Sequence, residues 1–64
     1  MTATAKNNTI KKAIAKHGRE KCITAYRMNY VHGEGASTIG IEMGVTTRQA
    51  DAMINAGRAI YVKN

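Results

Sequence analysis

The sequence of 64 residues contains no proline, tryptophan or phenylalanine, and its one cysteine is Cys22. A lone cysteine excludes an internal disulfide, and no Cys and His residues have the spacing of a zinc site. No apolar run reaches the roughly 18 residues of a membrane-spanning helix. The first nine residues are polar and no apolar signal core follows them, so we expect a cytoplasmic protein with no membrane partner. Cys22 then stays a reduced thiol.

The short chain leaves room for one small domain. A domain of about 60 residues buries only about 60% of the surface of its unfolded chain. Small domains without disulfides or metals are commonly stabilised by oligomerisation, most often as a homodimer. We therefore expect a flexible arm over residues 1–8 and one domain over residues 9–64 that forms a homodimer.

Acidic residues are scarce: four Asp and Glu stand against ten Lys and Arg, and the net charge is +6. Residues 1–32 contain seven Lys and Arg and one Glu, whereas residues 33–64 contain three basic and three acidic residues. A basic half beside a neutral half indicates a surface for a polyanion. The plainer alternative is that the lysines keep a small domain soluble.

Because proline is absent, glycine residues divide the chain into helix-sized segments. Asn8 or Thr9 can cap a first helix that ends at Gly18. The apolar residues of this helix have the i, i+3, i+4 spacing of one helical face, and its lysines lie on the other side. A second helix is expected from Arg19 to about His32, where a glycine-rich loop follows.

Two further helices are expected in the second half of the chain. The third covers residues 36–43, with Ser37 as its cap. Thr46 and Gln49 fit a capping box, in which each side chain bonds the backbone of the other residue at the start of a helix. This fourth helix is expected to stop near Gly57, since glycine is a poor helix former.

The last six residues, 59–64, are rich in residues that favour β-structure. They are compatible with a short C-terminal strand or with a last helical turn. The sequence as a whole predicts an all-α fold, a small bundle of about four short helices.

Residues 36–55 have the pattern of two short helices that cross at a turn. Gly44 can adopt the left-handed backbone that such a turn requires. Gly40 is small where the two helices must approach each other. The apolar residues at inward-facing positions are Ile39, Met43, Val45, Ala50 and Met53.

This segment resembles the helix-turn-helix of bacterial and phage DNA-binding proteins, which include repressors, activators, resolvase-type recombinases and small terminase subunits. The resemblance covers residues 36–55. Two positions depart from the pattern, because Gly40 stands where alanine is usual and Ala50 where a larger branched residue is usual. Both departures are expected to weaken the packing of the two helices.

The resemblance implies that the second helix lies in the major groove, with its early residues at the base edges. The residues implied to read bases are Thr47, Arg48, Gln49, Asp51, Ala52 and Asn55. Arg48 can bond guanine, and Gln49 or Asn55 can bond adenine. Asp51 suits a cytosine amine or a neighbouring arginine. The residues expected to contact the DNA backbone are Ser37, Thr38, Thr46, Lys11, Lys12, Lys16, Arg19, Lys21, Arg27 and Arg58.

We therefore expect a sequence-specific double-stranded DNA-binding protein, most simply a small bacterial or phage transcription regulator. Four scattered carboxylates in so small a domain do not suggest an active site, so an enzyme is not expected. No cofactor, metal or small-molecule ligand is expected either. Two alternatives remain: a protein-interaction module that inhibits a host enzyme, and a DNA-organising, excisionase-like or packaging accessory protein.

Overall fold

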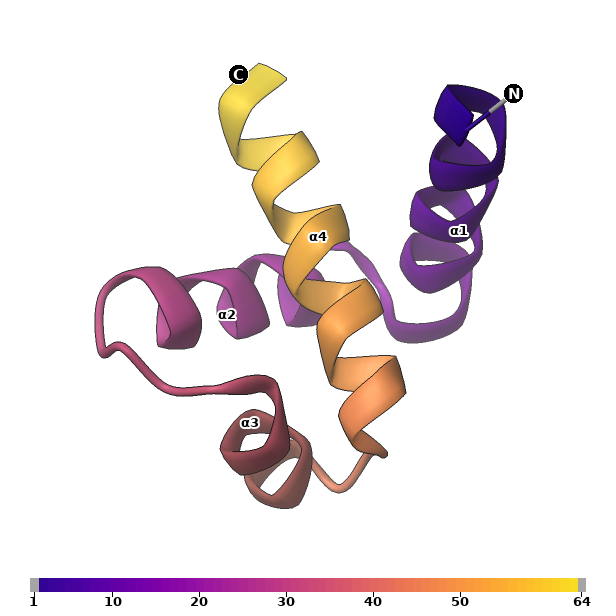
Figure 1. Cartoon of the computed structure of the whole chain (residues 1–64). Coiled ribbons are helices and arrows are strands. Elements are labelled where there is room, and N and C mark those ends of the chain that lie inside the picture. Colours follow the sequence, from indigo (N-terminus) through magenta and orange to yellow (C-terminus); the bar gives the residue numbers. More distant parts are fainter. Residues whose placement is uncertain (1, 64) are drawn as a thin grey trace.

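The structure, a computed structural model, describes the backbone of residues 2–63 and the side chains of residues 10–62. Its helices are α1 (Thr2–His17), α2 (Arg19–Tyr30), α3 (Ala36–Met43) and α4 (Thr47–Lys63) (Figure 1). No strand occurs within residues 2–63. The predicted all-α bundle of four helices is confirmed.

Helix α4 is the centre of the bundle and contacts each of the other three helices. Helix α1 runs antiparallel to α4 along one side, and α2 crosses α4 near its middle (Figure 1). Helix α3 lies at the end of the molecule where α4 begins (Figure 1). The first turns of α4 are therefore paired with α3, and its later turns pack against α1 and α2.

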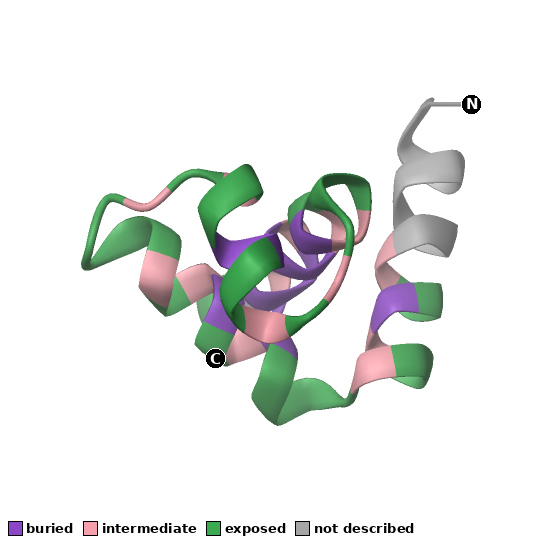
Figure 2. Ribbon diagram, turned by 90° about the horizontal axis from the view of Figure 1, so that it is seen from below, coloured by how far each residue is buried: buried purple, intermediate pink, exposed green. Residues whose placement is uncertain are grey.

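The core is wholly apolar in the part of the chain whose side chains are described. Buried residues gather where the helices meet (Figure 2). They are Ala13, Cys22, Ala25, Ile39, Ala50, Met53, Ile54, Ala56 and Ile60. Ile39 and Met53 are the largest fully buried side chains, and burial of each contributes about 1.5–3 kcal/mol. The alanines fill little space, so the helix backbones can lie close together.

The helix boundaries agree with the sequence-based prediction at most ends and differ at the start of α1 and the end of α4. Helix α2 begins at Arg19 as expected and ends at Tyr30, two residues before His32. Helix α1 begins at Thr2, so the predicted cap at Asn8 or Thr9 is wrong. The segment before Thr9 contains neither glycine nor proline, and its alanines and lysine are good helix formers, so nothing there stops the helix. The side chains of the arm predicted over residues 1–8 lie outside the described part of the chain, and its flexibility stays a prediction.

Helix α4 continues through Gly57 to Lys63, so the expected stop at Gly57 is wrong. The described part of the tail, residues 59–63, is helical, so of the two structures left open for the tail the helix is the one that forms. Gly57 is buried where α4 meets α2, and a Cβ atom there would overlap the carbonyl oxygen of Cys22. The close helix contact outweighs the low helix propensity of glycine, which costs about 1 kcal/mol relative to alanine.

Candidate nucleic-acid interface

The turn between α3 and α4 is built on Gly44. Its backbone has φ 73° and ψ 32°, the left-handed conformation that was predicted from the sequence. The N–H group of Gly44 donates to the carbonyls of Gly40 and Ile41, and that of Val45 donates to Gly40 O at 2.8 Å. These bonds satisfy the last carbonyl groups of α3 and direct the chain into α4.

Gly40 lies under this turn and is buried. A Cβ atom at this position would lie 2.8 Å from Val45 O and 3.2 Å from the carbonyl carbon of Thr46. The departure from alanine was expected to weaken packing. The structure corrects this expectation, because the turn closes against the backbone of Gly40 at a distance that a methyl group would prevent.

The start of α4 has the predicted capping box. The N–H group of Thr46 donates to Oε1 of Gln49 at 3.1 Å, and the N–H group of Gln49 donates to Oγ1 of Thr46 at 3.1 Å. Two N–H groups that have no partner inside the helix are thus satisfied by side chains. The first turn of α4 is fixed in place as a result.

The inward-facing residues of the motif pack as the sequence predicted. Ile39 and Ala50 are fully buried, and Met53 nearly so. Met43 and Val45 are half-buried and pack against the same core. The polar side of the first turns of α4 consequently lies outside the protein.

The predicted base-reading residues fall into two groups by exposure. Thr47, Arg48 and Asp51 are exposed, whereas Gln49, Ala52 and Asn55 are half-buried. The half-buried amides are also engaged, since Gln49 belongs to the capping box and Oδ1 of Asn55 accepts a hydrogen bond from Nη2 of Arg58 at 2.9 Å. Sequence reasoning missed the second bond, although the i, i+3 spacing of Asn55 and Arg58 on a helix is a signal for it.

The start of α3 differs in detail from the prediction. Its N-cap is Gly35, which makes no side-chain hydrogen bond, so the assignment of Ser37 as the cap is wrong. Ser37 and Thr38 lie within the first turn of α3 and are exposed. The first turn contains no acidic residue, and the free N–H groups of a helix start favour an anion such as a phosphate.

All basic residues that were predicted to contact the DNA backbone are exposed. They are Lys11, Lys12, Lys16, Arg19, Lys21, Arg27 and Arg58. Because α1 runs antiparallel to α4, the end of α1 that carries Lys16 points toward the end of the molecule where α4 begins (Figure 1). Thr46, the remaining predicted backbone contact, is exposed as well, but its hydroxyl oxygen already accepts the bond from Gln49.

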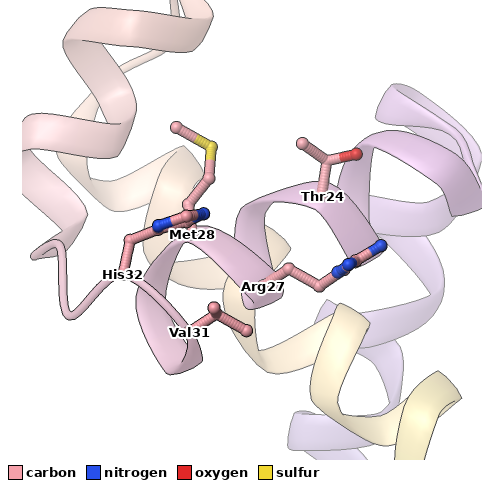
Figure 3. A pocket seen from close by; sticks show the side chains of 5 residues that line it. All are labelled: Thr24, Arg27, Met28, Val31 and His32. Atoms are coloured by element: carbon pink, nitrogen blue, oxygen red, sulfur yellow. The ribbon is translucent and has the colours of Figure 1, made fainter.

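A depression along α2 offers no comparable chemistry. It is lined by Thr24, Arg27, Met28, Val31 and His32 (Figure 3). These residues come from α2 and the two positions after it, and they include no carboxylate. In the described part of the chain, no group of three or more His, Cys, Asp or Glu residues is arranged to hold a metal ion.

Several large apolar side chains are exposed. Ile41 on α3 is 80% exposed. Tyr26 stacks on Tyr30 at a ring-centroid distance of 5.6 Å and contacts Tyr61 at the same distance in a tilted arrangement. Tyr30 and Tyr61 are themselves exposed, as are Val31 and Val62.

Comparisons with known proteins add no family assignment. No protein-family model matches the chain, and neither a curated protein sequence nor a solved structure does. Among the described residues, no helix has the length and apolar character needed to cross a membrane.

Proposed function

We propose that this chain is a sequence-specific double-stranded DNA-binding protein, most simply a small bacterial or phage transcription regulator. One observation carries the proposal. Helix α4 starts at a capping box two residues after the left-handed Gly44, and its exposed first turns present Arg48 and Asp51 to solvent. In proteins with a helix-turn-helix, the second helix of such a pair enters the major groove and reads base edges with its early residues.

The charge distribution supports a duplex partner. The exposed Lys and Arg residues of α1 and α2 suit phosphate groups, and the exposed Ser37 and Thr38 lie at the helix start of α3. Phosphate contacts of this kind position a protein on the duplex and carry no sequence information. They also make affinity depend steeply on salt, because each contact releases condensed counterions.

A homodimer is part of the proposal. A chain of 64 residues has a small core, and paired half-sites one DNA turn apart would double the recognised sequence. Sedimentation of the protein on its selected duplex tests this point. A monomer on a single, unrepeated site would remove the dimer from the proposal and leave DNA recognition in place.

Binding-site selection from a random duplex pool at two salt concentrations tests the function itself. The proposal expects one enriched sequence at both concentrations and lower affinity at the higher one. Binding to all duplexes with weak preference, or with bending, would instead favour a DNA-organising, excisionase-like or packaging protein. No duplex affinity at either salt concentration would overturn the proposal.

The exposed apolar side chains favour a second candidate, a protein-interaction module that inhibits a host enzyme. Tyr30 and Tyr61 are aromatic side chains of the kind enriched at interfaces, and they are exposed, as is the apolar Ile41. This candidate predicts no measurable duplex affinity in moderate salt. The same selection experiment therefore separates the two functions.

A further inference from the structure

Both amide side chains on the exposed side of α4 are already hydrogen-bonded within the protein. Oε1 of Gln49 accepts the Thr46 N–H at 3.1 Å, and Oδ1 of Asn55 accepts Nη2 of Arg58 at 2.9 Å. An amide reads adenine with its oxygen and its nitrogen together, because the base edge presents the N6 amine and the N7 acceptor. In this conformation each amide oxygen uses one of its two acceptor positions, and the bond holds the side chain against its own helix rather than extended toward a base.

Arg48 and Asp51 are different, because both are exposed and neither takes part in these bonds. Residues three apart on a helix are neighbours on one face, separated by about 4.5 Å along its axis. The forked arginine head fits O6 and N7 of guanine, and a carboxylate, which only accepts, fits the N4 amine of cytosine. These are the two major-groove edges of a G·C pair.

We propose that Arg48 and Asp51 together read one G·C pair, or two adjacent ones, and that Gln49 and Asn55 read no adenine. This inference rests on the proposed function and narrows its target to duplexes with guanine at the Arg48 position. It also accounts for an acidic residue on a DNA-facing surface. Phosphates repel the Asp51 carboxylate, and a base with a donor at its edge, such as the N4 amine of cytosine, offsets that repulsion.

Asn55 has a different task in this arrangement. Arg58 holds its oxygen in a hydrogen bond, while no bond to its N–H groups is seen, so these remain available as donors. Donors of this type suit a phosphate oxygen, which every sequence offers. The pair of Asn55 and Arg58 therefore contributes affinity that is the same for all duplexes.

The test uses the duplex that the full-length protein selects from a random pool. Arg48→Ala is expected to weaken binding to it by about 5- to 150-fold and to remove the preference at the contacted G·C pair. Asn55→Ala is the matched variant on the same face, and it is expected to weaken selected and unselected duplexes by the same factor. Circular dichroism of each variant verifies that the helices remain.

Two modified duplexes test the contact at the level of single atoms. Replacing the contacted guanine by 7-deazaguanine removes the N7 acceptor and is expected to weaken binding by the wild-type protein. Replacing it by inosine removes only the minor-groove N2 amine and keeps O6 and N7. Inosine is therefore expected to leave affinity nearly unchanged.

The outcomes separate this inference from the function on which it rests. A selected site of A·T pairs whose preference is lost in Asn55→Ala would overturn the G·C assignment and leave sequence-specific binding intact. Equal effects of inosine and 7-deazaguanine would overturn it as well. Failure to bind any duplex, even in low salt, would instead remove the proposed function.

Discussion

Gly57 of α4 lies against the backbone carbonyl of Cys22 of α2, at the point where the two helices meet. The contact leaves no room for a side chain, since a Cβ atom at Gly57 would also lie 2.7 Å from Cβ of Tyr26. The distance between these helices is therefore set by a residue that helix propensity alone would disfavour.

The variant Gly57→Ala tests this contact. Alanine would gain about 1 kcal/mol of helix propensity but must push α2 and α4 apart, and overpacking of this kind typically costs about 1–3 kcal/mol. Urea unfolding is expected to show a net loss of stability. Arg58→Ala, at the exposed neighbouring position, is the control and should change stability by no more than about 0.5 kcal/mol. A more stable Gly57→Ala variant would contradict the close contact.

The capping box at Thr46 and Gln49 makes a second prediction. Thr46→Ala removes the hydroxyl that accepts the Gln49 N–H, and loss of such a cap costs about 0.5–2 kcal/mol. Thr46→Ser retains the hydroxyl and is expected to stay close to the wild-type stability. Thermal unfolding of both variants provides the measurement, and equal destabilisation by alanine and serine would show that the hydroxyl does not cap α4.

The exposed Lys12 on α1 makes a prediction about salt. If it contacts a phosphate, Lys12→Ala is expected to weaken all duplexes alike and to reduce the slope of log affinity against log salt by about one unit. Lys12→Arg preserves the charge and should preserve the slope. Fluorescence anisotropy titrations at several salt concentrations supply these values. A slope that is unchanged in Lys12→Ala would place this lysine away from the duplex.

The carboxyl groups of Glu34 and Glu42 give the fold a dependence on pH. Hydrogen bonding to Glu34 raises the pKa of Glu42 above its ordinary 4.5, and burial and the charge of Glu34 act in the same direction, while His32 opposes them. The folded state thus binds a proton more readily than the unfolded state. The stability that this proton provides is present below pH 4.5 and is lost as pH rises through the raised pKa.

Urea unfolding at a series of pH values, from below 4.5 up to neutral pH, measures this effect. Glu42→Gln and Glu34→Gln each leave one carboxyl without its acidic partner. Both variants are therefore expected to lose less stability than the wild type as the pH rises. An unaltered pH profile in both variants would contradict the interaction between the two groups.

The buried thiol of Cys22 makes a prediction about reactivity. Its Sγ atom lies 3.7 Å from the carbonyl oxygen of Ala13, to which it donates, and burial raises the pKa of the thiol. The reactive thiolate is therefore scarce in the folded protein. Alkylation by iodoacetamide at pH 8 is expected to be slow in buffer and fast in urea. Rapid modification in buffer would contradict the burial of this side chain.

Much of the turn between α3 and α4 could be predicted from the sequence because its signals are local. Gly44 adopts the left-handed conformation, and Thr46 and Gln49 form the capping box, as their residue types and spacing indicate. The same locality explains an ambiguity in the candidate site. Gln49 fits both a helix cap and an adenine reader, and only the three-dimensional structure shows that its oxygen is engaged at the cap.

Features that depend on contacts between distant segments could not be predicted in this way. Gly57 has the local signature of a helix end, and the reason for its place inside α4 is a carbonyl group 35 positions earlier in the chain, at Cys22. From the sequence, Gly40 likewise indicates loose packing between α3 and α4. In the structure the turn lies directly against its backbone, so the packing there is tight. The base contacts, the dimer and the regulatory role stay predictions.

Helix α4 divides its length between two tasks. The exposed Thr47, Arg48 and Asp51 belong to its first turns, whereas Gly57 and Ile60 lie buried further along. Substitutions at the first three positions change the exposed surface at the start of α4 without touching the helix crossing that holds the bundle together. If the proposed function is correct, exchanging a few surface residues at the start of α4 changes the DNA sequence that the protein prefers. The stability of the fold then stays nearly the same.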